Sequence, residues 1–184
     1  KAFELKFQSE SGSTEYAWNT SWGVSTRMIG GLVMTHGDDN GVRTPPRLAP
    51  IEVVIVPIWK SDEERARLLE AAYQVKQELS TWNGRGDDRI RVHVDAREGM
   101  KPGAKYYEWE LQGVPLRLEI GPRDLASGAC MSARRDTRAK ASLSFVGLPE
   151  TIATLLTTIQ GDMLHAARER REANSIREPI SYDR

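Results

Sequence analysis

The feature that most constrains the fold is an unbroken run of β-branched residues, Val53-Val54-Ile55-Val56. Such a run is typical of a strand that helices cover on both faces, as in a parallel sheet. After it, segments with helical periodicity at 62–79 and 102–112 alternate with segments of strand-like alternation at 90–94 and 114–120. Because helices and strands alternate, we expect an α/β fold with a mixed, mostly parallel sheet flanked by helices and right-handed crossovers.

The first part of the chain has a different pattern. Apolar and charged residues alternate over 2–7, a Ser-Gly-Ser turn signal follows, and a second short strand is expected at 16–19. Ser25 or Thr26 can then cap a helix that runs to about His36. We therefore expect a β-hairpin and a helix before the α/β domain.

A stiff connector separates these two regions, because in Thr44-Pro45-Pro46 proline fixes its own φ and restrains the residue before it. Toward the C-terminal end, weaker patterns predict strands at 129–134 and 141–145 and a last helix opening at Pro149. The predicted organisation is a first region at 1–44, a linker at 45–50, a second domain at 51–165, and a helix end with a tail at 166–184.

Composition excludes several classes of function. Lys plus Arg and Asp plus Glu number 26 each, which argues against a strongly cationic, non-specific nucleic-acid binder but not against a local basic patch. A single cysteine, Cys130, allows no internal disulfide and no cysteine-rich zinc site, and fits a reducing compartment such as the cytoplasm. His36, His93 and His165 show no ligand spacing, so we expect no metal site. No segment approaches the ~20 apolar residues of a membrane span, and a start without Met inside an alternating pattern indicates a fragment.

Three loops should meet beyond the carboxyl ends of the strands, where open α/β sheets bind ligands: 57–60, 95–101 and 121–124. With residues close by in sequence they combine cations, acids and aromatics, a mixture that fits a reader of unpaired RNA bases. Pattern alone favours the alternative, a solvated sheet rim with ordinary ion pairs. The side chains are Lys60, Arg97, Lys101, Arg123, Asp95, Glu98, Asp124, Trp59, Tyr106, Tyr107 and Trp109.

Two further patterns admit a structural and a functional interpretation. Arg117 and Glu119 share one face of a strand, and their spacing alone favours a structural ion pair, just as Trp109 is by default a core residue. In the segment 20–27 a strand runs into a glycine turn and a helix whose first turn carries Arg27. A helix N-terminus with an arginine can hold a phosphate, although pattern alone favours a capped helix with a surface arginine.

Two stretches carry a resemblance to a known family. The stretch Thr20-Ser21-Trp22-Gly23-Val24-Ser25-Thr26-Arg27-Met28-Ile29-Gly30-Gly31, followed by Met34-Thr35-His36-Gly37-Asp38-Asp39, resembles motif 3 of prolyl-tRNA synthetases of the archaeal and eukaryotic type. The stretch Pro45-Pro46-Arg47-Leu48-Ala49-Pro50-Ile51, which runs into the strand at 53–56, is similar to their junction with the anticodon-binding domain. Segments within 102–124 look like the core of that domain, and the similarity reaches about Ala173.

The resemblance implies roles for individual residues. Arg27 occupies the position of the catalytic motif 3 arginine, which holds the triphosphate of ATP, and Ser25 matches a position near the nucleotide. A fixed guanidinium would help most as charge builds on the leaving pyrophosphate. The positions that match the proline and adenylate pocket are Ser21, Trp22 and Gly23, and those that match anticodon-reading positions are Glu110, Arg117 and Arg123, with a further contact from Lys140.

The resemblance also implies what the whole enzyme does. It would be a homodimeric, cytoplasmic class II ligase that forms prolyl-adenylate from L-proline and ATP with Mg²⁺ and then charges tRNA(Pro). Because motifs 1 and 2 are absent from this sequence, we expect the chain alone to bind neither ATP nor Mg²⁺, to be inactive, and to supply anticodon recognition.

Two alternatives remain. A non-catalytic RNA-binding module of the same domain type would not need the motif 3 segment. A small nucleotide-binding α/β protein would need a glycine-rich phosphate loop after its first strand, where this chain has Pro57-Ile58-Trp59-Lys60.

Overall fold

The computed structural model describes residues 3–86 and 88–177. The chain divides into two compact units, Lys1–Gly30 and Gly31–Arg184, which are treated separately below. Two sequence-based expectations, a strand that includes Ala2 and a tail that extends over residues 178–184, lie in part outside the described residues.

The first unit contains the expected β-hairpin. Strands β1 (Lys6–Gln8) and β2 (Thr14–Tyr16) pair antiparallel, with Lys6 opposite Tyr16. Both strands differ from the predicted ranges. Glu4 has a φ of 49°, a left-handed conformation that ends the extended segment, so the first strand begins only at Lys6. The Ser9 amide donates to the Ser13 carbonyl, and this tight turn brings Thr14 opposite Gln8, so the second strand starts earlier than expected and ends at Tyr16.

Helix α1 (Arg27–His36) follows, with nearly the predicted bounds. Its first turn is closed by amides of Met28 and Ile29 that donate to the carbonyls of Ser25 and Thr26. Gly37 comes directly after the helix, where its amide donates to the Val33 carbonyl. The sequence pattern therefore predicted this helix and, closely, both of its ends.

The second unit is built on a five-stranded sheet in the order β4-β3-β5-β6-β7. Strand β3 pairs in parallel with β4 and with β5, whereas β5–β6 and β6–β7 are antiparallel. The expected mixed α/β sheet is confirmed, with its parallel half built by β3, β4 and β5 and its antiparallel half by β6 and β7. The strands are β3 (Val53–Pro57), β4 (Val92–Val94), β5 (Leu116–Ile120), β6 (Ala129–Arg134) and β7 (Lys140–Ser144).

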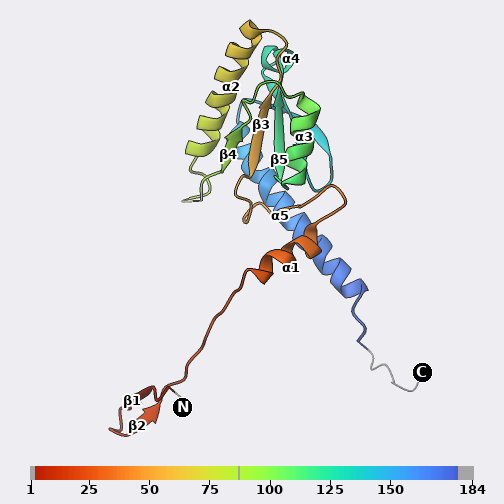
Figure 1. Cartoon of the computed structure of the whole chain (residues 1–184). Coiled ribbons are helices and arrows are strands. Elements are labelled where there is room, and N and C mark those ends of the chain that lie inside the picture. The colour runs from red at the N-terminus through yellow and green to blue at the C-terminus, as the bar shows by residue number, and fades with distance from the viewer. Residues whose placement is uncertain (1–2, 87, 178–184) are drawn as a thin grey trace, which may run out of the picture. The chain divides into compact units, whose positions relative to one another are not determined.

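Helices cover both faces of this sheet (Figure 1), as the run at 53–56 predicted. Helices α2 (Asp62–Thr81) and α5 (Leu148–Ala173) pack on one face, where they enclose the main apolar core with Ile55, Leu118 and their neighbours. Helix α3 (Pro102–Leu111) covers the opposite face, where Trp109 packs on Val54 and Val56 in a smaller cluster. Each residue of β3 is buried, so this strand is the centre of the unit. Among the described residues no helix combines the length and apolar character that crossing a membrane requires.

A short helix, α4 (Pro122–Ala126), was not anticipated, because its residues were expected to form a loop. Pro122 occupies the first turn, where proline is favoured. The Asp124 carboxylate accepts a hydrogen bond from the Gly121 amide at 2.8 Å, which caps the helix. This acid, predicted as part of a ligand-binding rim, is therefore used to stabilise the backbone.

The segment between α1 and β3 is held against the end of α3. The Val42 amide donates to the Leu111 carbonyl and the Thr44 amide to the Gly113 carbonyl, both at 3.2 Å. Gly113 has a φ of 76°, and a Cβ there would lie 2.6 Å from the Val42 carbonyl oxygen. Glycine is needed at this point because the two backbones approach too closely for a side chain.

Candidate functional site

Charged side chains from α3, β5 and β7 meet on the face of the sheet that α3 covers. We call Tyr106, Glu110, Arg117, Glu119 and Lys140 the α3–β5 charge cluster. Arg117 Nη1 donates to Glu110 Oε1 at 2.8 Å, and Arg117 Nε and Nη2 donate to Glu119 Oε1 at 3.2 and 3.1 Å. Lys140 Nζ lies 3.3 Å from the same Glu119 oxygen. The structure thus brings together three of the four predicted anticodon-reading residues.

The cluster is anchored in the protein interior and open at its outer edge. The side chains of Arg117 and Glu119 are only 8% and 11% exposed, whereas those of Glu110 and Lys140 are 41% and 53% exposed. The predicted structural ion pair between Arg117 and Glu119 is confirmed. It holds the guanidinium in place, while the second carboxylate and the ammonium face solvent beside it.

Tyr106 completes the cluster. The Arg117 guanidinium lies 4.0 Å from the centre of its ring, within the range of a cation–π contact. Burial, and after it the charge and hydrogen bond of Glu119, raise the pKa of the Tyr106 phenol far above its usual range. The ring therefore stays neutral at physiological pH and supports the guanidinium from one side.

Arg123 lies apart from this arrangement. It sits in the first turn of α4, is exposed, and within residues 3–86 and 88–177 no hydrogen bond or ion pair joins it to the cluster. Its predicted role therefore depends on its position beyond the carboxyl end of β5. Of the other basic residues of the predicted rim, Lys60 and Lys101 are exposed.

Arg97, the remaining basic residue of the predicted rim, forms ion pairs with two carboxylates. It donates to both oxygens of Asp95, at 2.9 and 2.8 Å, and to Glu108, so at this residue the rim has ordinary ion pairs. Burial alone would raise the pKa of Asp95, but hydrogen bonds from Arg97 and Trp109 outweigh it and hold that pKa well below its usual range. Lys105 is itself buried and donates to the carbonyls of Asp95 and Arg97. These contacts fix the start of α3 on the loop after β4. A hollow of about 280 Å³ lies beside them, next to Trp59.

The residues predicted to form a nucleotide and proline site lie in the first unit. Ser21, Trp22 and Gly23 have no regular secondary structure, and Trp22 is 93% exposed. Ser25 precedes α1, Arg27 is the first residue of that helix, and both are exposed. The expected strand and glycine turn before the helix are not formed, because β2 ends at Tyr16 and residues 17–25 have no regular secondary structure. Arg27 does open helix α1 as expected, and a helix start with an arginine is an arrangement that can hold a phosphate.

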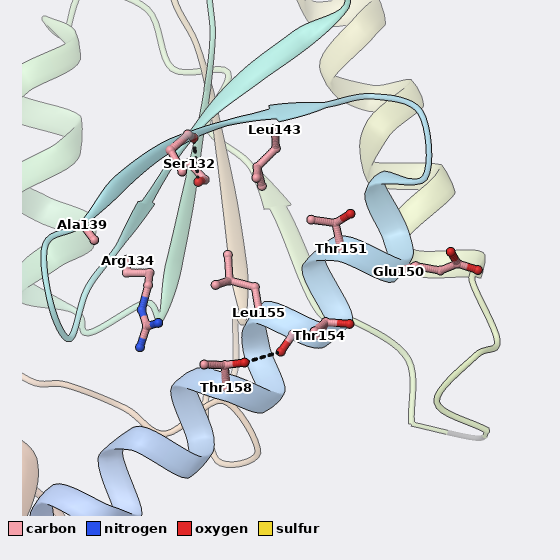
Figure 2. Close-up of a pocket in the computed structure, with 10 residues that line it drawn as sticks. Ser132, Arg134, Ala139, Leu143, Glu150, Thr151, Thr154, Leu155 and Thr158 are labelled. Carbon is pink, nitrogen blue, oxygen red and sulfur yellow. Dashed lines mark hydrogen bonds between the residues drawn. The ribbon is translucent and has the colours of Figure 1, made fainter.

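A groove of about 480 Å³ lies between β7 and the first turns of α5, on the sheet face opposite the cluster (Figure 2). Leu143 and Leu155 point into it, with Arg134 and Glu150 toward its two ends. Three of its hydroxyls donate to main-chain carbonyls: Ser132 to Ala141, Thr151 to Gly147 and Thr158 to Thr154. The groove therefore presents an apolar surface and none of the predicted site residues.

Sequence reasoning assigned neither Tyr106 nor Glu119 to the anticodon-reading set. The signal for Glu119 was present, since a period of two on one strand places it on the same face as Arg117. Tyr106 is four residues before Glu110 on α3, a spacing that puts both on one side of a helix. Among the described residues no group of His, Cys, Asp and Glu is arranged to hold a metal ion.

Comparison with known proteins gives a consistent result. Residues 52–155 match a family model described as the anticodon binding domain. Curated proteins named proline–tRNA ligase align with the whole chain, among them those of Chloroflexus aurantiacus and Chlorobium phaeobacteroides, each 48% identical. The chain spans only 37% and 36% of the length of these two relatives.

A solved structure agrees with this. The chain is similar to a prolyl-tRNA synthetase from Cryptosporidium parvum in complex with L-proline and AMP, with a TM-score of 0.80 and 35% sequence identity. The similarity covers 95% of this chain and 36% of that one.

Proposed function

The chain belongs to the anticodon-binding domain family, and from that premise we propose that it is the tRNA-reading part of a proline–tRNA ligase. The observation that carries the proposal is the gradient of exposure across the α3–β5 charge cluster. A guanidinium fixed by a buried carboxylate stands beside a half-exposed carboxylate and an exposed ammonium. Because these side chains are already held in place, they can contact a nucleic acid without the entropic cost of ordering them first.

The chemistry of the cluster fits unpaired bases. A proline anticodon carries guanines, which offer acceptors that a guanidinium matches and N–H donors that a carboxylate matches. Glu110 and Arg117 supply these two functions side by side, joined by a bond of 2.8 Å. Lys140, and Arg123 beyond the end of β5, supply positive charge for phosphates. We therefore assign base reading to the first pair and charge to the second.

The proposal is tested by tRNA binding at fixed salt, because phosphate contacts make affinities salt-dependent. The chain should bind a tRNA with a proline anticodon at least about tenfold more tightly than the same tRNA with the anticodon bases exchanged, as the loss of one good base contact requires. Equal affinity for the two RNAs would contradict the proposal.

Variants separate the two assigned roles. Glu110→Gln should reduce the preference between the two tRNAs, because the amide replaces an acceptor with a donor. Arg123→Gln should weaken binding of both tRNAs alike and leave the preference unchanged. Arg67→Gln, at an exposed position on α2, is the matched control and should change neither quantity.

The first unit fits a role in the catalytic part of the enzyme. Its aromatic side chains are strongly exposed, with Trp18 at 102% and Trp22 at 93%, which is typical of surfaces that another part of a protein covers. We assign the ATP contacts to Ser25 and Arg27 and the proline and adenylate pocket to Ser21, Trp22 and Gly23. Residues 1–44 would thus be the end of a catalytic domain, 45–50 a linker, 51–165 the anticodon-binding domain, and 166–184 a helix end and tail.

The whole enzyme would join L-proline to tRNA(Pro) with ATP and Mg²⁺, as a cytoplasmic homodimer. Because this chain spans about a third of its relatives, it would bind neither ATP nor Mg²⁺ by itself. A pyrophosphate-exchange assay with proline should give no signal with this chain, and formation of prolyl-adenylate would contradict the assignment.

A further inference from the structure

Arg135, directly after β6, connects two parts of the second unit that are distant in sequence. Its side chain is almost completely buried, and its amide donates to the Pro115 carbonyl. Nε donates to the main-chain carbonyl of Glu110 at 2.8 Å. Nη1 and Nη2 donate to the two carboxylate oxygens of Asp38, at 2.9 and 2.6 Å. All three guanidinium nitrogens are therefore used, one toward α3 and two toward the segment after α1.

Asp38 is fixed from several sides. It forms a bridge with Gly41 across a tight turn, and its carboxylate accepts the Asn40 amide at 3.0 Å. Arg43 lies 3.8 Å away and the exposed Arg138 4.0 Å away. The fork from Arg135 is the main cause that holds the pKa of Asp38 well below its usual range. The carboxylate is therefore ionised at physiological pH, as a bidentate pair with arginine requires.

The contact to Glu110 places this pair next to the charge cluster. The Glu110 carbonyl lies in the last turn of α3, where it already accepts the Gly113 amide at 3.1 Å, and Arg135 supplies a second donor. The side chain of the same residue binds Arg117. A displacement of the end of α3 would therefore move the Glu110 carboxylate relative to the guanidinium beside it.

We propose that Arg135, held by Asp38, is a positioning residue for anticodon reading. It fixes the last turn of α3 so that Glu110 and Arg117 present their paired groups to a base in one geometry. This inference rests on the proposed function. It assigns specificity to two residues that make no contact with the bases, and one of them belongs to the segment that follows α1.

The test compares Arg135→Lys and Asp38→Asn with the unaltered chain. Lysine keeps the charge but lacks the planar fork, and asparagine keeps the shape but lacks the charge. Each variant is titrated with the tRNA that carries the proline anticodon and with the anticodon-exchanged tRNA, and its thermal unfolding is recorded. Arg138→Lys is the matched control, because Arg138 lies near the same carboxylate but is 68% exposed.

The expected result is a loss of about tenfold in the preference for the matched tRNA in both variants, the size of one lost charge-assisted hydrogen bond, with Arg138→Lys unchanged. If the role of Arg135 were purely structural, the variants would have a lower melting temperature and would bind both tRNAs equally more weakly. An unchanged preference would therefore overturn the inference. Should Arg135→Lys fail to fold, the milder Asp38→Asn decides. Absence of any preference in the unaltered chain would refute the proposed function itself and remove the basis of the inference with it.

Discussion

Removing Arg117 from the Glu110–Arg117 ion pair should destabilise the chain much more than neutralising Glu110. In Arg117→Met the buried Glu119 loses both guanidinium donors, at 3.2 and 3.1 Å, and keeps the Tyr106 hydroxyl and Lys140, which is 53% exposed. An unpaired buried charge costs about 3–5 kcal/mol. Because Lys140 still offers partial compensation, we expect the lower value, about 3 kcal/mol, which lowers the melting temperature of a domain of this size by about 10 °C.

Glu110→Gln should behave differently. The Glu110 side chain is 41% exposed, and Arg117 keeps its bonds to Glu119 when Glu110 is neutralised. An exposed ion pair contributes at most about 1 kcal/mol, so the free energy of unfolding should fall by no more than that. Urea unfolding followed by far-UV circular dichroism measures both variants, with Arg67→Met as a control for loss of a surface arginine. The reasoning is refuted if Arg117→Met unfolds at the same urea concentration as the unaltered chain, or if Glu110→Gln is the more damaging change.

Three further outcomes follow from the geometry. Gly113→Ala should destabilise the chain more than Gly128→Ala in urea unfolding: both glycines have positive φ, worth about 1–2 kcal/mol, but only at Gly113 would the methyl meet a carbonyl, that of Val42. Burial raises the pKa of the Cys130 thiol to about 11, so this thiol should react with a chromogenic disulfide reagent only as fast as the chain unfolds. The pKa of Asp95 is depressed on folding, so its contribution to stability is complete above about pH 4 and is lost as the pH falls further; Asp95→Asn should be less stable at neutral pH and show a shallower decrease in acid.

Local patterns in the sequence were enough to predict the sheet and its helices. The β-branched run at 53–56 and the alternation after it identified β3, β4, β5, α2 and α3, because burial on both faces leaves a direct mark on composition. The boundaries in the hairpin failed for a physical reason, since neither the left-handed conformation at Glu4 nor the tightness of the turn is encoded by polarity alternation. Helix α4 was missed because five residues are too few to show a helical period.

The candidate site was predictable only in part. The pair Arg117–Glu119 could be read from a period of two within one strand, and the resemblance added Glu110 and Lys140. The bond between Asp38 and Arg135 joins positions separated by 97 residues, and nothing local to either residue marks it. Contacts of this kind depend on the order of strands in the sheet, which brings the β6–β7 turn to the end of α3.

Helix α3 is fixed at both ends, and this has a consequence for how the domain would read RNA. Near its start the buried Lys105 donates to the carbonyls of Asp95 and Arg97, and at its end Arg135 donates to the Glu110 carbonyl. Between these points Trp109 donates to Asp95 at 2.8 Å, so the helix cannot turn about its axis without breaking a buried bond. A reading group on such a helix loses little conformational entropy when it binds, whereas a group on a mobile loop would. A wrong anticodon base would therefore fail to match the fixed carboxylate of Glu110 and guanidinium of Arg117. This discrimination should appear mainly as faster dissociation of the wrong tRNA.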